Sequence, residues 1–296
     1  MDRMIRCITA DGGIMAAAVD STYMVAAAQQ IHGTSPVATA ALGRLLTGSS
    51  LMGSMLKKQG ATVCLKVNGG GPLGSVVAIA DANGNCRGYV EHPDVTLPLR
   101  SDGKLDVGGA VGRSGLLGVI RDYGEGQPYT GQVELRSGEI AEDLTYYYGT
   151  SEQIPTVCAL GVLVDKTDSR RLLAGGMLVQ VLPGASEEAI SRLEQNAAAL
   201  EPVTTMLARG MTIEEMCRKV LNGFSMEILD EFQVHYACTC SREKVERAFL
   251  TLPEKDLLSL ADEKTGIAEA RCQYCGRTYR FTKEELENLA RKNRKN

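Results

Sequence analysis

The sequence predicts an α+β protein with an N-terminal mixed α/β core domain and antiparallel sheets at residues 1–182. A helical linker at 183–233 and a small cysteine-rich C-terminal domain at 234–296 complete the prediction. Short β-type runs separated by turn residues indicate the sheets, and a few apolar helical segments accompany them. Pro183-Gly184 marks the first boundary, and two close pairs of cysteines identify the last domain.

The first 60 residues predict two strands and two helices. Apolar residues at 5–19, interrupted by Asp11-Gly12-Gly13, indicate a strand, a turn and a second strand. An Ala-rich helix then begins at Asp20 or Ser21 and ends near His32-Gly33. Ser35-Pro36 begins a second helix, which we expect to reach about Lys58. Because this helix has apolar faces and three internal glycines, we expect it to be buried against another backbone.

Residues 61–182 predict mostly strands. A G-x-G-x-x-G pattern begins at Gly69, but a strand follows it, so it does not indicate a dinucleotide site. One helix is expected from Ser137 to about Gly149, and a polar turn at 166–169 should join the last two strands. The predicted strands are 62–67, 75–80, 87–91, 116–122, 132–135, 156–165 and 171–182.

The segment after Pro183-Gly184 predicts an interrupted, amphipathic helical linker. Ser186 begins a helix that Pro202 ends. Thr212 and Glu215 form a capping box for a later helix, which stops at Asn222-Gly223. Such a segment can dock on the core but has little stability alone. The residues fit both a permanently docked linker and a releasable one.

Four cysteines in the last domain have the spacing of a tetrahedral zinc site. They are Cys238 and Cys240, and Cys272 and Cys275, and Gly276 follows the second pair. Apolar and aromatic neighbours place Cys272 and Cys275 at the tip of a short hairpin, where backbone amides can point at the sulfurs. Helices are expected after Ser241, from Pro253 and from the capping box Thr282–Glu285.

Two interpretations of this zinc site remain open on the residues alone. A small domain buries too little core to fold well, so the metal can be a structural staple. The Cys-x-Cys spacing of the first pair, however, brings two thiolates close enough to oxidise once the metal leaves. Thiolates are also the form of cysteine that oxidants attack. A redox switch therefore fits as well as a staple.

Charge, apolar content and cysteine content limit the classes of function that the chain can have. The chain carries a net charge of −4. Residues 233–296 contain 13 Lys/Arg and 10 Asp/Glu, a net of +3, which leaves −7 for the rest. The basic tail at 291–295 is typical of a solvated helix end. No run of about eighteen apolar residues and no secretory signal occurs. With nine cysteines we therefore expect reduced thiols in a cytosol and no membrane partner.

No catalytic centre is predicted. The remaining cysteines are scattered through apolar runs and are interpreted as buried or incidental thiols, namely Cys7, Cys64, Cys86, Cys158 and Cys217. The three histidines have no metal or triad spacing, although His235 lies near enough to Cys238 in the sequence to tune the thiolates. A nucleophile elbow and a phosphate loop are both missing from the sequence. We therefore expect a protein that is not an enzyme.

The whole chain resembles the thirty-three-kilodalton, redox-regulated heat-shock chaperone family of bacteria. The C-terminal residues that carry the resemblance are Cys238-Thr239-Cys240-Ser241-Arg242-Glu243 and Cys272-x-x-Cys275. The N-terminal ones are His32-Gly33-Thr34-Ser35-Pro36, Gly71-Pro72-Leu73-Gly74, Arg87-Gly88-Tyr89, Gly103-Lys104-Leu105, Tyr129-Thr130-Gly131, the run 137–143 and Ser151-Glu152-Gln153.

This resemblance implies an ATP-independent holdase that is inactive while reduced and bound to one Zn²⁺ per chain. Oxidation would form the disulfides Cys238–Cys240 and Cys272–Cys275 and expel the zinc. The C-terminal domain would then unfold and the linker loosen, and unfolding client proteins would bind the exposed apolar surface. By the same analogy, residues 1–182 would bind clients and form the homodimer expected in the active state.

Two other function classes are weighed against the holdase. A zinc-containing nucleic-acid-binding protein would use the basic tail, but the domain's net charge is small and aromatic stacking residues are not evident, so no specific nucleic acid is expected. A thiol oxidoreductase would need a low-pKa Cys-x-x-Cys at the start of a helix in a βαβ unit, whereas this pair is predicted in a hairpin.

Overall fold

The computed structural model describes residues 1–296 with the exception of 166–171, 263 and 294–296. The chain divides into two compact units, Met1–Ala237 and Cys238–Asn296. The polar turn predicted at 166–169 lies outside the described residues. In the described part of the chain, no helix combines the length and hydrophobicity needed to cross a membrane.

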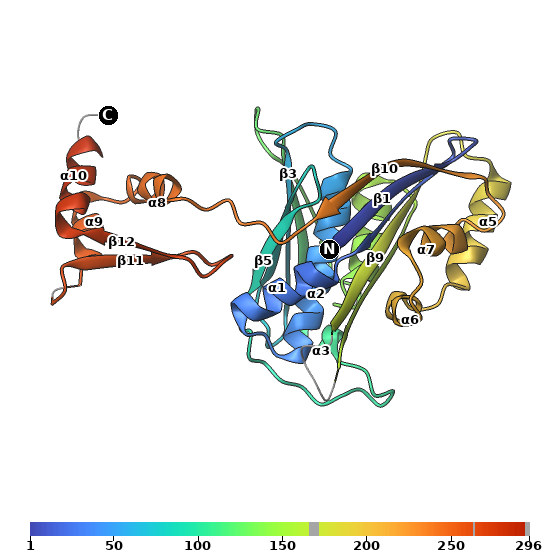
Figure 1. Cartoon of the computed structure of the whole chain (residues 1–296), viewed down its shortest axis with the longest axis horizontal. Coiled ribbons are helices and arrows are strands. Elements are labelled where there is room, and N and C mark those ends of the chain that lie inside the picture. The colour runs from blue at the N-terminus through green and yellow to red at the C-terminus, as the bar shows by residue number, and fades with distance from the viewer. Residues whose placement is uncertain (166–171, 263, 294–296) are drawn as a thin grey trace. The chain divides into compact units, whose positions relative to one another are not determined.

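The first unit contains two antiparallel sheets of five strands each (Figure 1). The first sheet has the order β10 (Met226–Val234), β1 (Asp2–Thr9), β2 (Ile14–Asp20), β9 (Leu172–Val181) and β8 (Thr156–Val164). The second has the order β5 (Cys86–Val90), β4 (Val76–Asp81), β3 (Thr62–Gly70), β6 (Gly112–Asp122) and β7 (Tyr129–Glu134). The predicted mixed fold with antiparallel sheets is therefore confirmed.

Helix α2 (Pro36–Ser54) is the buried centre of this unit and contacts strands of both sheets. The Ser35 side chain accepts a hydrogen bond from the Ala38 amide, as the Ser-Pro start predicts. Its glycines allow close approach, because a Cβ at Gly53 would collide with the carbonyl oxygen of Asp81. The helix ends at Ser54 and not near Lys58.

Shorter elements complete the core. Helix α1 (Thr22–His32) precedes α2, and the predicted helix at 137–149 is formed by α4 (Ala141–Tyr147) and the π-helical turn η1 (Tyr148–Glu152). Sequence analysis missed the one-turn helix α3 (Val107–Val111), which lies in a Gly-rich segment with weak helical propensity.

Three linker helices cover one face of the first sheet. They are α5 (Glu187–Ala198), α6 (Val203–Ala208) and α7 (Ile213–Val220). Met206, Met216 and Val220 on these helices are fully buried with sheet residues such as Ile5 and Met177. The predicted Thr212–Glu215 capping box is present and begins α7. The linker is thus docked through a continuous apolar interface.

The predicted helical linker is wrong at its end, because residues 226–234 form strand β10 and pair with β1. The two partners lie more than 200 residues apart, so local sequence patterns do not reveal the pairing. Past β10, the Ala237 amide donates to the carbonyl of Cys86 at 2.8 Å. The compact unit therefore continues to Ala237.

The second unit is small and has a small core. It contains α8 (Arg242–Phe249), α9 (Glu254–Ser259), the hairpin β11 (Ile267–Arg271) and β12 (Thr278–Thr282), and α10 (Lys283–Asn293). Ser241 caps α8, and Thr282 and Glu285 make the second predicted capping box. Among the described residues, six are buried in its core, including Leu257 and Phe281, and α8 contributes none. So small a core supports little independent stability.

Candidate metal centre in the second unit

The four predicted cysteines lie on two short segments of the second unit. Cys238 and Cys240 precede α8, and Cys272 and Cys275 lie in the turn between β11 and β12, as predicted. The turn closes through hydrogen bonds from the Gly276 amide to the Cys272 carbonyl and from the Cys272 amide to the Arg277 carbonyl, both 2.9 Å. Gly276 has φ of +71°, a conformation that glycine adopts without strain.

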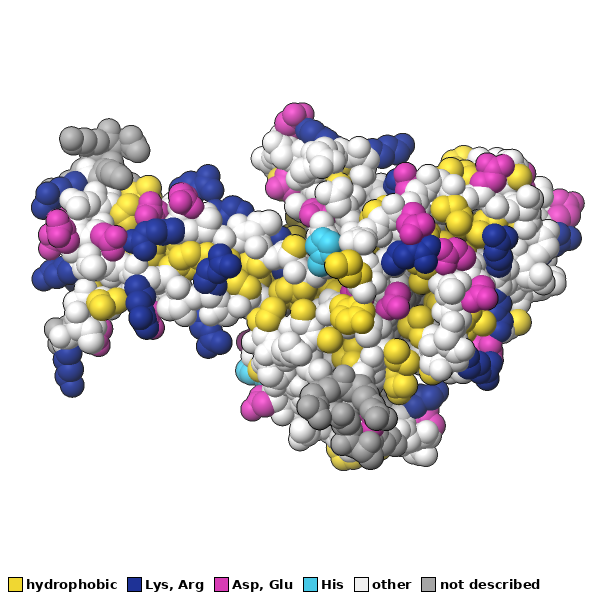
Figure 2. Space-filling view, viewed as in Figure 1, with side chains coloured by type: hydrophobic (Ala, Val, Ile, Leu, Met, Phe, Trp, Pro, Cys, Tyr) yellow, Lys and Arg dark blue, Asp and Glu magenta, His cyan; other side chains and the backbone are white. Residues whose placement is uncertain are grey.

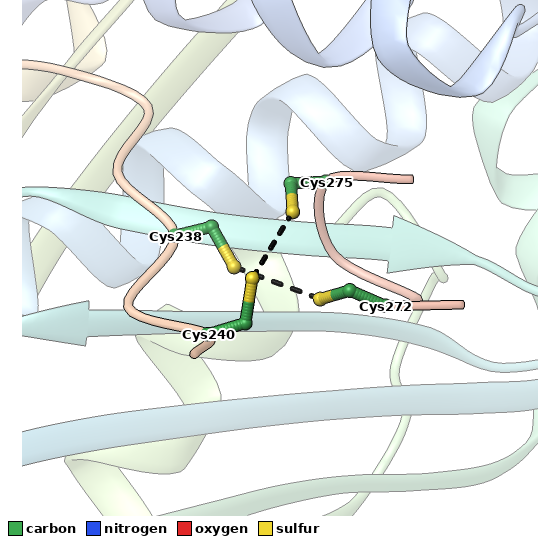
Figure 3. A group of neighbouring side chains, drawn as sticks. All are labelled: Cys238, Cys240, Cys272 and Cys275. Carbon is green, nitrogen blue, oxygen red and sulfur yellow. Dashed lines mark hydrogen bonds between the residues drawn. The ribbon is translucent and has the colours of Figure 1, made fainter. Parts of the chain in front are cut away.

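The four sulfur atoms converge on one point (Figure 3). All lie within 4.8 Å of one another. Cys238 Sγ is 3.7 Å from Cys272 Sγ, and Cys240 Sγ is 3.4 Å from Cys275 Sγ. Four thiolates around a tetrahedral zinc at about 2.3 Å would be about 3.8 Å apart. The cluster therefore has the size and the donor set of a four-thiolate metal site.

Two short sulfur–sulfur contacts connect the two cysteine-bearing segments. Both contacts join a cysteine before α8 to a cysteine of the hairpin turn. Such an arrangement holds the two segments together through their sulfurs. Within the described residues, the group of possible ligands contains these four thiols and no histidine, so His235 is not among them.

The thiols differ in acidity in the metal-free cluster. Burial raises the pKa of Cys238 to about 12. Burial also opposes ionisation of Cys240, but hydrogen bonds from Tyr279 and from the neighbouring thiols outweigh it and lower the pKa of Cys240 to about 7. The hydroxyl of Tyr279 lies 3.1 Å from Cys240 Sγ. Cys240 therefore ionises at much lower pH than Cys238.

Comparison with known proteins assigns the chain to a family. The family model described as Hsp33 protein matches residues 2–282. The chain belongs to the Hsp33 protein family.

Several bacterial relatives of this Hsp33 family member carry the name 33 kDa chaperonin. The protein from Acetivibrio thermocellus is 43% identical over 98% of this chain and 97% of its own length. That from Agathobacter rectalis is 45% identical over 97% of this chain and 99% of its own. A crystal structure of the 33 kDa chaperonin (heat shock protein 33 homolog) from Thermotoga maritima matches with a TM-score of 0.88 and 34% identity, covering 99% of both chains. These relatives support the mixed fold and the chaperone family.

Sequence analysis missed two side chains that support the cysteines of this Hsp33 protein. Tyr279 is one of the aromatic residues that flank the hairpin turn, and its hydroxyl donates to Cys240. The ammonium group of Lys244 donates to the carbonyl of Thr239 at 2.6 Å and so holds the Cys-x-Cys segment against α8. Tyr279 lies four residues after Cys275 and Lys244 four after Cys240, and this spacing is the signal that could have indicated them.

The five scattered cysteines lie in the first unit and outside this cluster. Cys7, Cys86 and Cys217 are buried, and Cys64 and Cys158 are half-buried. Burial raises the pKa of Cys158 to about 12 and also raises that of Cys64 and Cys86. Because thiols, unlike thiolates, are poor nucleophiles, burial keeps these three unreactive.

Proposed function

We propose that this Hsp33 family member is a redox-regulated, ATP-independent holdase chaperone. The observation that carries the proposal is the convergence of Cys238, Cys240, Cys272 and Cys275 in a unit with few buried residues. One oxidisable centre thus supports the fold of the whole unit. The chaperone family and this geometry together favour a switch over a permanent staple.

In the reduced state the four thiolates would hold one Zn²⁺. The bound metal supplies a structural cross-link between the Cys-x-Cys segment and the hairpin turn. Structural zinc contributes roughly 10–16 kcal/mol of apparent binding free energy to a small domain. A core built on Leu257, Phe281 and a few neighbours cannot replace that contribution.

Oxidation would remove the cross-link. Two thiolates lose two electrons to hydrogen peroxide and form one disulfide, and the peroxide takes up protons and is reduced to water. We propose the pairs Cys238–Cys240 and Cys272–Cys275, so that two peroxides convert all four thiolates. Disulfide sulfurs are poor zinc ligands, so the metal leaves and the second unit unfolds.

Loosening of the linker would then expose the client-binding surface. Helices α6 and α7 cover apolar residues of the first sheet, among them Ile14, Met177 and Val179. Helix α6 also forms one wall of a cavity of about 1200 Å³ beside β8, whose other lining residues include Leu97 and Leu163. Release of α5–α7 would join these surfaces into one apolar patch, which is typical of protein-binding sites.

The remaining assignments follow from the same proposal. Clients are unfolding proteins, the core at residues 1–182 binds them, and the active form is a homodimer in the cytosol. The face of the second unit visible in Figure 2 carries Lys and Arg interspersed with Asp and Glu. Such mixing does not favour the basic groove that a nucleic-acid-binding protein needs.

The decisive experiment compares reduced, zinc-loaded protein with peroxide-treated protein. Heat-denatured client is mixed with each form, and its aggregation is followed by light scattering. We expect suppression only after peroxide treatment, together with release of zinc and loss of free thiols. Equal suppression by the two forms would exclude the redox switch, and no suppression by either would exclude the holdase.

A further inference from the structure

Strand β10 is the least buried strand of the first sheet. It lies at the sheet edge and pairs only with β1, to which it runs antiparallel (Figure 1). Six of its nine residues are exposed, and Ile228 and Leu229 are 45% and 51% exposed. The register shifts between Arg6 and Cys7, which leaves Leu229 unpaired in a bulge. Backbone hydrogen bonds therefore hold β10 more than side-chain burial does.

The side chains that attach β10 to β1 are mainly charged. The Arg3 guanidinium donates to Glu231 at 2.5 Å, and that of Arg6 donates to Asp230 at 2.5 Å. Both acidic partners are about half exposed, so solvent screens each pair and it stabilises β10 only weakly. The ring of Phe232 packs against the main core beside its cross-strand partner Met4.

Both ends of β10 are held by segments that the proposed switch would loosen. At its first end, Phe224 before the strand and Met226, its first residue, pack against the core that the linker helices share with the first sheet. After it, the hydroxyl of Tyr236 donates to the Gly88 carbonyl at 2.8 Å, and Cys238 follows two residues later. If the linker unfolds, β10 loses the packing at its N-terminal end. If the second unit also unfolds, the chain beyond the C-terminal end of β10 is no longer ordered.

Departure of β10 would leave an unsatisfied edge on a core strand. Met4 of β1 is fully buried in the main core, and β1 keeps its antiparallel pairing with β2, so β1 itself stays in place. Its outward N–H and C=O groups would lose their partners, and such an edge pairs readily with another extended chain. Arg3 and Arg6 would lie along that edge without their β10 carboxylates.

We propose, building on the holdase function above, that β10 occupies in the resting protein the place where an extended client segment pairs with β1 in the activated protein. The preferred segment resembles β10 itself, with apolar residues for the core side and acidic residues opposite Arg3 and Arg6. In the resting protein, β10 thus takes the place of a client strand. Unfolding proteins supply such segments because their strands have lost their own partners.

A peptide with the sequence of Met226–Val234 tests the proposal. The labelled peptide is titrated with full-length protein, and fluorescence anisotropy reports binding. We expect binding to peroxide-treated protein, little binding to reduced zinc-loaded protein, and displacement by unfolded client. A matched peptide with Asp230→Lys and Glu231→Lys should bind about tenfold more weakly, because like charges then face Arg3 and Arg6. The variant Arg3→Glu/Arg6→Glu should restore its binding.

Hydrogen exchange gives a second readout on the unmodified chain. Bound client should slow exchange of amides at residues 2–9 in the oxidised protein and leave residues 226–234 fast. Aggregation suppressed without peptide binding and without protection of residues 2–9 would overturn the strand-pairing proposal and leave the holdase intact. Equal binding of the peptide by the reduced protein would also overturn it. A failure to suppress aggregation after oxidation would instead reject the holdase function.

Discussion

Tyr279 and Cys240 show how one hydrogen bond distinguishes four chemically identical thiols. The phenol donates to Cys240 Sγ at 3.1 Å. Burial opposes ionisation of Cys238, Cys240 and Cys275. Nevertheless, the pKa of Cys240 falls to about 7, while that of Cys238 rises to about 12. In a reduced second unit that has just lost its metal and is still folded, an oxidant or alkylating agent should therefore react with Cys240 before Cys238.

The variant Tyr279→Phe tests this assignment. Loss of the donor should raise the pKa of Cys240 toward the ordinary thiol value and lower its thiolate fraction at pH 7 severalfold. The measurement is the rate of iodoacetamide modification of each cysteine between pH 6 and 9, followed by mass spectrometry in the first moments after a chelator removes the zinc, before the second unit unfolds. Cys238 serves as the internal control, because it should remain slow in both proteins. An unchanged pH profile for Cys240 would remove Tyr279 from this role.

At the scale of elements, the docking of α7 decides whether the apolar face of the first sheet is covered. Met216 and Val220 are fully buried against that sheet, and the Thr212–Glu215 box begins the helix. α7 has only eight residues, too few for a stable helix on its own. The segment is therefore helical only while it is packed on the sheet.

We predict that Met216→Ala weakens this docking by about 2–5 kcal/mol, the usual loss for a large-to-small change at a buried site. The reduced, zinc-loaded variant should suppress client aggregation partly without any peroxide. Arg218→Ala is the matched control, because Arg218 is exposed on the same helix. Zinc content should stay unchanged in both variants.

Limited proteolysis of the linker separates the two ways in which this prediction can fail. If the Met216→Ala linker is cleaved faster and the protein still does not suppress aggregation, the covered sheet face is not the client surface. If neither cleavage nor activity changes, α7 docking does not depend on Met216.

For the whole molecule, the two compact units should differ in their dependence on metal. The first contains two sheets around α2 and an extensive core, whereas the second has a small core and the four-thiolate cluster. A unit whose fold depends on the ion unfolds when the ion is removed. The stability of the chain is thus unevenly distributed along its length.

Removal of zinc by a chelator under reducing conditions should therefore unfold the second unit, while the core around α2 keeps its fold. Amides at residues 238–293 should exchange rapidly, while those of α2 and β2 stay protected. Hydrogen exchange with mass spectrometry measures both regions in one sample, and added zinc should restore the protection. Persistent slow exchange at 238–293 in the zinc-free protein would contradict the proposed role of the metal.

The sequence by itself determined the features that depend on nearby residues. The spacing of Cys238, Cys240, Cys272 and Cys275 predicted a shared site, and the structure brings their sulfurs together. The caps at Ser35, Thr212 and Thr282 were likewise predicted, because a capping side chain bonds to an amide about three residues away. The ligand and redox roles of the four cysteines remain predictions.

Only the tertiary structure decided the pairing of β10 with β1 and the contact of Tyr279 with Cys240. Residues 226–233 were predicted in the helical linker and Val234 in the C-terminal domain, since their strand partner lies at the opposite end of the chain. In the sequence, Tyr279 only flanks the hairpin turn. The fold brings Cys240, 39 residues earlier, next to it. Spacing along the chain encodes short-range geometry, whereas distant contacts form only when the whole core packs.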